Sequence, residues 1–392
     1  MNKTSSNSLS FTEEQAMLLE ASREFCRKKS TIEDVRKQLD TVLGYDINVW
    51  NEMVDLGWLS IAIPEHLSGS GLGVNGLVPL IENMGRAMLG TPLVSTVLAA
   101  QLLIRADAGE YSERLLQKII GGTPATIAFL ENSDWGDTKI RCKIGSDLTI
   151  QGTKDFVDDA MAAQIFILPL IKNGELVLAL VDRQQISDNA IFPHVLIDQT
   201  KRSARIDFSG IKIESSQIIE NDRVEKSLCD VRIIGALLVA AEQAGSSAAC
   251  LNTIVDYLST RKQFDNLIGS YQALKHPAVE MLTMLDSSRS FIYHAATIIS
   301  DMSIDRDMKI ACHMAKAQAT ATITSKLFSI ATSDTKQALG ACIFWLKTQA
   351  GWKETDVVEI NNVSDEKERF EQLVKSVRQS KLTKADSNES TH

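Results

Sequence analysis

The hydrophobic pattern of this chain changes its period twice, and that change constrains the fold more than any other feature. From about Phe11 to Gly122, apolar residues recur every three to four positions, as in amphipathic helices. From about Pro124 to Ile219 the period is two, in short runs such as TIAFL, AQIFILPLI and ELVLALVD separated by turn residues. From about Asp222 to Ser380 the helical pattern returns in long segments. The sequence therefore predicts an α+β chain of several domains.

Four segments follow from this division. Residues 1–123 are predicted to form an all-α domain, and residues 124–221 a central β domain, either a small barrel or a sandwich. Residues 222–381 carry three or four long helices, which predicts a four-helix bundle. Residues 382–392 are polar and are predicted to be disordered.

Charge and composition exclude several classes of function. The net charge of −9 argues against a sequence-independent nucleic-acid binder, which needs a basic face. The amino-terminal residues lack an apolar core, so no secretory signal is predicted, and we expect no apolar run long enough to span a bilayer. The cysteines show no CxxC pair, so we predict free thiols, no metal site and a cytoplasmic protein. They are Cys26, Cys142, Cys229, Cys250, Cys312 and Cys342.

Two motifs in the carboxy-terminal half resemble those of the acyl-CoA dehydrogenases, whose layout is also helices, then strands, then a helical bundle. The first is RKQFDNLIGSYQALKH, residues 261–276, which we expect to be helical and which matches a family pattern R-x-x-F followed by I-G-x-x-Q-x-x-x-H. The second is QALGACIF, residues 337–344, set against Q-x-x-G-G-x-G-F; there Ala341 and Ile343 replace glycines.

The resemblance implies a flavin cofactor. In the family these motifs hold the ADP half of an FAD that belongs to the neighbouring subunit. The chemistry is consistent, because a guanidinium offers a planar fork of donors to a pyrophosphate and side-chain amides add hydrogen bonds. The cofactor-binding candidates are Arg261, Gln263, Phe264, Gln272, Gln337, Gly340 and Ala341.

The half of the site that would hold the flavin ring departs from the family pattern. The resemblance places the ring against the β domain of the same subunit, on a G-x-K strand and a loop ending in Ser-Asp. Here the loop reads AFLENSDWGDTKI, with Ser133-Asp134 but no glycine-rich lead-in, and the strand reads GTKDFVDDA. Asp158 stands where a hydroxyl is expected, and a carboxylate would repel the negative charge of reduced flavin. Asp158 and Asp159 also fit a plain turn.

Both positions at which the family carries its catalytic base lack an acid. One lies in a loop before the last helix, where this chain reads EINNVS and places Asn362. The other lies 26 residues before the motif arginine, where this chain has Gly235 followed by Ala236. Three other carboxylates remain as candidates: Glu359, Glu242 and Asp256, of which Glu359 is the strongest because it lies in the expected loop.

These features resemble the base-lacking subunit of heteromeric α2β2 acyl-CoA dehydrogenases. The resemblance implies an FAD shared across an interface with a paralogous catalytic subunit, a bulky substrate such as a steroid side-chain acyl-CoA, and an electron-transferring flavoprotein as acceptor. Two alternatives stay open. One is a homomeric dehydrogenase with Glu359 as base, and the other is a flavin-free scaffold subunit.

Overall fold

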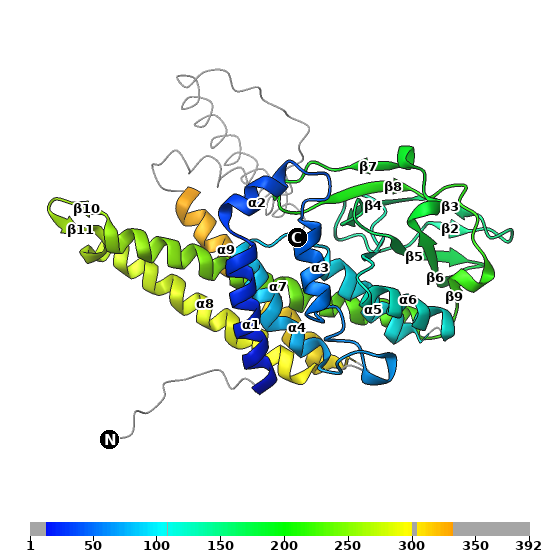
Figure 1. The fold of residues 1–392 in the computed structure, drawn as a ribbon, viewed down its shortest axis with the longest axis horizontal. Helices are drawn as coiled ribbons and strands as arrows, with labels where there is room; N and C mark the ends of the chain where they lie inside the picture. The colour runs from blue at the N-terminus through cyan, green and yellow to red at the C-terminus, as the bar shows by residue number, and fades with distance from the viewer. Residues whose placement is uncertain (1–12, 108, 300–303, 332–392) are drawn as a thin grey trace, which may run out of the picture. The chain divides into compact units, whose positions relative to one another are not determined.

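The computed structural model describes residues 13–107, 109–299 and 304–331, and Figure 1 shows their arrangement. Helices come first, two sheets follow, and long helices return after them. This order confirms the α+β class and the order of elements predicted from the hydrophobic period. The second motif and Glu359 lie outside the described residues.

Six helices precede the first strand. Helix α3 ends where Gly57 adopts a φ of 74°, and α4 and α5 are separated at residues 88–92, as the Gly90-Thr91-Pro92 sequence indicates. The helices are α1 (Glu13–Lys29), α2 (Ile32–Leu39), α3 (Ile47–Asp55), α4 (Gly73–Ala87), α5 (Leu93–Ala106) and α6 (Glu110–Ile120).

The β region contains two sheets that share one apolar core. A six-stranded sheet has the order β3-β2-β5-β6-β9, with β1 pairing in parallel with β5, and a three-stranded sheet has the order β4-β8-β7. The strands are β1 (Ala125–Ile127), β2 (Lys143–Ile144), β3 (Ile150–Gln151), β4 (Thr153–Asp158), β5 (Ile165–Lys172), β6 (Glu175–Asp182), β7 (Ile191–Pro193), β8 (Ser203–Asp207) and β9 (Ile218–Ile219). Buried side chains from both sheets pack together, which matches the sandwich alternative.

Strand β5 is apolar without alternation because both of its faces are covered. Phe166 and Leu168 point into the core between the sheets, whereas Ile165 and Ile167 pack with helices α5, α6 and α7. A strand buried on both faces reads as a continuous apolar run. These apolar contacts hold the β region against helices α5, α6 and α7.

Helix α7 (Val224–Thr260) runs for 37 residues and joins two apolar cores. It is long and apolar enough to span a membrane by length and composition, contrary to the prediction of no such segment. However, 56% of its apolar window is buried inside the fold, and the core helix of a globular protein passes the same test. Helices α8 (Gln272–Ile298) and α9 (Arg306–Ala331) follow it.

Two glycines allow α4 and α7 to cross in backbone contact. A Cβ on Gly85 would lie 2.1 Å from the Glu242 carbonyl oxygen, and a Cβ on Gly245 would lie 1.8 Å from the Glu82 carbonyl oxygen. Neither position has room for a side chain, since real Cβ contacts are longer than 3.0 Å. This crossing fixes where the middle of α7, including Glu242, lies relative to the amino-terminal helices.

Candidate cofactor-binding site

The first motif forms a hairpin between two helices, so the prediction of a helical segment at Arg261–His276 is wrong for its first half. Strands β10 (Lys262–Gln263) and β11 (Asn266–Leu267) pair antiparallel between α7 and α8, as Figure 1 shows. The two loop residues, Phe264 and Asp265, have φ values of 51° and 61°. A two-residue hairpin turn with positive φ at both central positions matches the twist of the strands, and it ends the helix.

Phe264 is presented to solvent in a strained backbone conformation. Its side chain is 86% exposed, and a bulky residue with positive φ is an outlier that costs about 1–2 kcal/mol. The turn is supported by hydrogen bonds from Asn266 Nδ2 to the Phe264 carbonyl oxygen (3.0 Å) and from Tyr271 Oη to the Gln263 carbonyl oxygen (3.0 Å). Strain held in place by its neighbours is a feature of functional sites.

The other predicted residues of this motif lie on the same exposed tip. Arg261, Gln263 and Gln272 are exposed, and within the described part of the chain Arg261 has no ion pair or side-chain hydrogen bond. A group of large apolar side chains surrounds them at the joined ends of α7 and α8. These side chains, which we call the tip patch together with Phe264, are Val255, Tyr257, Leu267, Tyr271, Leu274, Val279 and Leu282.

The tip lies far along α7 from the β sheets. Arg261 comes 19 residues after Glu242, which forms an ion pair with Lys201 of the β region. At a rise of 1.5 Å per residue this separation is about 28 Å along the helix axis. The described structure therefore does not bring the Arg261 hairpin and the β4 strand of the same chain into one site.

Strand β4 ends at Asp158, and Asp159 follows it, where the β region meets helices α5 and α7. Asp158 pairs in register with Ser203 of β8. Asp159, with a φ of 51°, accepts a hydrogen bond from Ser95 Oγ of α5 (2.6 Å), and its backbone N–H donates to the Arg202 carbonyl oxygen (2.9 Å). Lys201, two residues before β8, forms an ion pair with Glu242 of α7.

Crowding raises the pKa of both carboxyls. Asp158 is exposed. The surrounding protein nevertheless desolvates its carboxyl group and, with Asp159 and Glu242 nearby, raises its pKa to about 7. Burial likewise raises the pKa of Asp159 to about 6, although the Ser95 hydroxyl and Lys201 oppose the shift. Asp159 begins the turn that the sequence allowed, since the Ala162 and Ala163 N–H groups donate to its carbonyl oxygen (2.9 Å each), and Asp158 is the last residue of the strand before it.

Two of the candidate bases named from the sequence, Glu242 and Asp256, lie on α7. Gly235 is a helical residue whose Cβ would lie 3.5 Å from Leu98, so no acid occupies that position. Glu242 is engaged by Lys201, and Asp256 is exposed near the tip. Glu359 lies outside the described residues, as do Gln337, Gly340 and Ala341, so their roles stay predictions.

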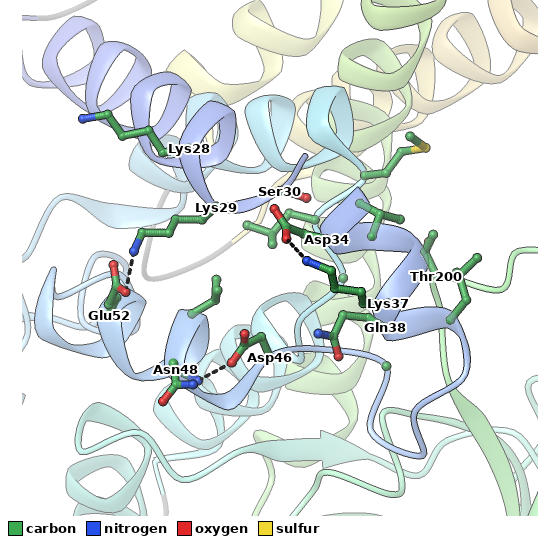
Figure 2. Close-up of a pocket in the computed structure, with 17 residues that line it drawn as sticks. Lys28, Lys29, Ser30, Asp34, Lys37, Gln38, Asp46, Asn48, Glu52 and Thr200 are labelled. Atoms are coloured by element: carbon green, nitrogen blue, oxygen red, sulfur yellow. Dashed lines mark hydrogen bonds and ion pairs between the residues drawn. The ribbon is translucent and has the colours of Figure 1, made fainter. Parts of the chain in front are cut away.

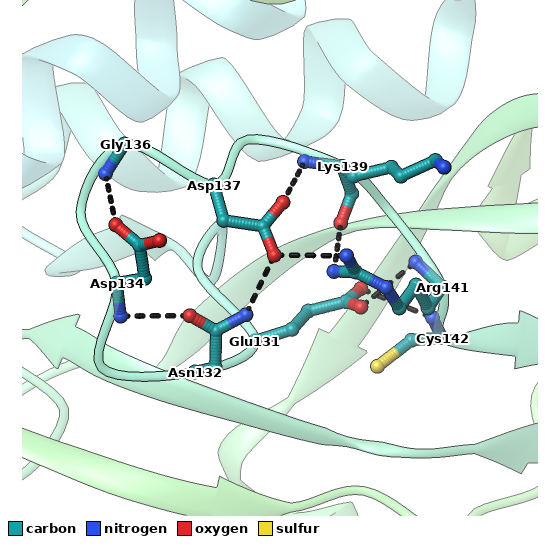
Figure 3. A network of polar contacts seen from close by, with 8 residues as sticks. All are labelled: Glu131, Asn132, Asp134, Gly136, Asp137, Lys139, Arg141 and Cys142. Atoms are coloured by element: carbon teal, nitrogen blue, oxygen red, sulfur yellow. Dashed lines mark hydrogen bonds and ion pairs between the residues drawn. The ribbon is translucent and has the colours of Figure 1, made fainter. Parts of the chain in front are cut away.

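The loop before β2 is held by a carboxylate other than the one that the sequence suggested. Asp137 binds the Arg141 guanidinium (2.8 Å) and accepts hydrogen bonds from Asn132 Nδ2 (3.0 Å) and the Lys139 N–H (3.2 Å), as Figure 3 shows. The carboxylate of Asp134, in the Ser133-Asp134 pair, accepts from the Gly136 N–H within the turn (3.0 Å), and its backbone N–H donates to Asn132 Oδ1 (2.7 Å). The hydrogen bond from Arg141 is the main reason that the pKa of Asp137 is lowered.

A buried ion pair beneath this loop was not predicted. Lys154 Nζ of β4 lies 2.8 Å from Glu131 Oε1 and 2.8 Å from the Pro169 carbonyl oxygen, and its side chain is fully buried. Glu131 also accepts from the Cys142 N–H (3.0 Å). Gly152 of the same G-x-K strand has a φ of 132°, and a Cβ there would lie 2.4 Å from Cys142 Sγ. The matched glycine and lysine therefore have structural reasons to be present.

A polar hollow of about 310 Å³ lies between α1, α2 and α3, away from every residue that the sequence singled out. Figure 2 shows its charges paired with one another, Lys29 with Glu52 (2.7 Å) and Lys37 with Asp34 (3.1 Å). Asp46 caps the first turn of α3 through the Asn48 N–H (2.8 Å). We assign no ligand to this hollow.

Comparison with known protein families agrees with this architecture. A profile described as the acyl-CoA dehydrogenase N-terminal domain matches residues 12–123, and the profile of the acyl-CoA dehydrogenase C-terminal domain matches residues 234–327. Together the two profiles match more than half of the chain. The chain belongs to the acyl-CoA dehydrogenase family. The resemblance inferred from the two motifs is confirmed at this level.

Individual relatives extend the comparison. Acyl-CoA dehydrogenase IpdE2 of Mycolicibacterium smegmatis is 28% identical over 294 residues, covering 74% of this chain and 79% of the relative. Among solved structures, the ChsE4-ChsE5 complex from Mycobacterium tuberculosis matches with a TM-score of 0.68 and 20% identity, covering 90% of this chain and 100% of that one. Butyryl-CoA dehydrogenase from Megasphaera elsdenii matches with a TM-score of 0.71 and 18% identity, covering 90% and 92%. At these identities the structures establish the fold.

Proposed function

We propose that this chain is a subunit of an FAD-dependent acyl-CoA dehydrogenase complex and that it completes the FAD site of a paralogous catalytic subunit. The observation that carries the proposal is the exposed hairpin, whose Arg261 and Phe264 face solvent about 28 Å along α7 from the β region of their own chain. Residues so placed fit a cofactor held by another subunit. The solved ChsE4-ChsE5 structure is itself a complex, which supports a heteromeric assembly.

The residues of the hairpin fit the ADP half of FAD. An exposed guanidinium suits a pyrophosphate, Phe264 offers an aromatic wall, and the side-chain amides of Gln263 and Gln272 can donate hydrogen bonds. Gln337, Gly340 and Ala341 are proposed to complete this half. Bound FAD would accept the hydride that leaves the β-carbon of an acyl-CoA thioester, while the α-proton would go to a base.

This chain is proposed to support the reaction without supplying that base. Gly235 stands at one of the two acid positions, and a Cβ there would meet Leu98 at 3.5 Å. A bulky acyl group such as a steroid side chain, an electron-transferring flavoprotein as acceptor and a cytoplasmic location complete the proposal. The tip patch gives a partner subunit an apolar surface to cover, since monomers rarely expose such a cluster.

The test is the flavin content of the complex formed by co-expression with an acid-bearing paralogue. Arg261→Ala should weaken FAD binding by on the order of 2–4 kcal/mol, or about thirty-fold to a thousandfold, because it removes the charged partner of the pyrophosphate. Lys262→Ala removes a neighbouring exposed cation at a position that the R-x-x-F pattern leaves open, and it should retain flavin. Unchanged flavin occupancy in Arg261→Ala would sink the proposal.

Two other results would favour the alternatives. A yellow chain purified alone that reduces an electron acceptor with an acyl-CoA would favour the homomeric dehydrogenase with Glu359 as base. A complex that never contains flavin would favour the scaffold subunit.

A further inference from the structure

A cavity of about 430 Å³ lies where the start of α7 meets the end of α5 and the start of α6. The short helix at Glu65–Leu67 contributes to its wall, and Leu103, Ile104 and Leu116 give it an apolar side. Small-molecule sites typically measure about 300–1,000 Å³, whereas one water molecule takes up about 30 Å³ in the liquid. The cavity is therefore large enough for a ligand of several ring or chain atoms.

This cavity is separate from the regions that the family resemblance assigns to the flavin and the base. Asp230, the lining residue furthest along α7, comes five residues before Gly235. Five residues turn an α-helix through about 500°, which leaves the two side chains about 140° apart around the helix axis. Arg261 comes 31 residues after Asp230, at the other end of the same helix. The cavity therefore belongs to neither region.

Two buried polar atoms on residues that line the cavity have no hydrogen-bond partner among the described residues. One is Ser112 Oγ, on a residue that is 3% exposed, and the other is Asp230 Oδ1, on a residue that is 2% exposed. The second oxygen of Asp230 lies 2.9 Å from Lys226 Nζ and 3.6 Å from Arg105 Nη1. Buried polar atoms nearly always have a partner, so these two atoms mark places where a bound molecule can supply one.

The charges around the cavity cancel one another. Asp107 forms an ion pair with Arg223, in the same way that Asp230 pairs with Lys226. A charged ligand would therefore meet as many like charges as opposite ones, whereas a hydroxyl group can donate one hydrogen bond and accept another. Besides His66, the titratable residues of the lining are three cations and three carboxylates: Arg105, Arg223, Lys226, Asp107, Glu113 and Asp230.

We propose that this cavity binds an uncharged molecule with several hydroxyl groups, such as a sugar or a cyclic polyol. Hydroxyl groups of the ligand bond to Ser112 and Asp230, and its C–H face packs against Leu103, Ile104 and Leu116. The site goes beyond the proposed function, since it shares no residue with the hairpin.

The test follows binding of myo-inositol to the full-length chain by saturation-transfer NMR. Cyclohexanecarboxylate and cyclohexylammonium are matched probes with the same ring size, one negatively and the other positively charged. Inositol should bind saturably, and neither charged ring should displace it at equal concentration, because the charges of the lining cancel.

Three variants locate the binding. Ser112→Ala should weaken inositol binding by about three-fold to ten-fold, because it removes one hydrogen bond to the ligand. It should keep the melting temperature, since the hydroxyl has no partner to lose. The matched control is Ser247→Ala, which removes another buried hydroxyl without a described partner, outside this cavity, and should leave binding unchanged. Ile104→Phe fills part of the cavity and should abolish binding.

Each contrary result overturns a stated part of the proposal. Absence of saturable inositol binding to the folded chain would overturn it, and so would equal weakening in Ser112→Ala and Ser247→Ala. Displacement of inositol by either charged ring would overturn the assignment to an uncharged ligand. If Ser112→Ala does not fold, inositol binding of unaltered strength in Ile104→Phe would overturn the site. None of these results depends on flavin content, so they are distinguishable from a failure of the proposed function.

Discussion

The two regions that the family resemblance assigns to FAD differ in exposure and packing, although α7 connects them. At the outer end of α7 the hairpin displays Arg261 and Phe264 to solvent, and the side chains around them are uncovered. In the middle of α7 the helix packs against α4 at Gly245, and Glu242 forms an ion pair with Lys201. One region of α7 is therefore exposed and the other is fixed by packing and by an ion pair.

The two regions also differ in what stabilises them. The middle of α7 and the β region contain buried apolar cores, and Lys154 of β4 is fully buried. The tip has few buried residues, since the buried positions of α8 begin at Leu285. Backbone strain is therefore tolerated at the tip because the rest of the fold supplies the stability, whereas a change in the packing of α7 should unfold the chain.

The largest expected effect tests the packed part of α7. Gly245→Ala should destabilise the chain by about 3 kcal/mol, because the new Cβ would meet the Glu82 carbonyl oxygen at 1.8 Å and force the helices apart. Gly235→Ala on the same helix is the matched control, since its Cβ would be in ordinary contact with Leu98 at 3.5 Å. Replacing a helical glycine there should stabilise by about 0.5–1 kcal/mol. Denaturant unfolding measures both, and equal effects would contradict the comparison.

A smaller effect tests the strain at the tip. Phe264→Gly should stabilise the isolated chain by about 1 kcal/mol, because glycine adopts positive φ without a steric penalty. Phe264→Ala removes the ring but keeps a Cβ, so it should leave the free energy of unfolding nearly unchanged. Both variants should lower the flavin content of the complex. A glycine variant no more stable than the alanine variant would show that the turn stores no strain.

The smallest effect tests the Asp158 carboxyl group through the pH dependence of stability. The pKa of Asp158 is raised in the folded chain to about 7, whereas the unfolded value is near 4. The folded state then binds the proton more tightly, so this group makes stability fall as pH rises from about 4 to about 7. Because Asp158 is exposed and screened, the loss should be below about 1 kcal/mol. Asp158→Asn should flatten the pH dependence of the melting temperature, and an unchanged slope would contradict the assignment.

Several features of the fold could be read from the sequence for plain physical reasons. A period of 3.6 or 2 in apolar residues follows directly from the geometry of helices and strands, so the order of elements was predictable. The apolar run at β5 was predicted as a strand, although burial of both its faces required the structure. The helix predicted across Arg261–His276 begins only at Gln272, because the chain turns through positive φ at Phe264 and Asp265, and a bulky residue such as Phe264 rarely adopts positive φ.

The sequence by itself determined the class of fold and the family, because these depend on local periodicity and on side-chain chemistry at fixed spacing, and the residues proposed for the flavin site rest on the same spacing. Only the tertiary structure decided that Arg261 is exposed far from its own β strands and that Lys201 forms an ion pair with Glu242. Lys201 and Glu242 are 41 residues apart, and Ser95 and Asp159 are 64 apart. Contacts at such separations arise from how whole elements pack, and no local pattern in the chain records them.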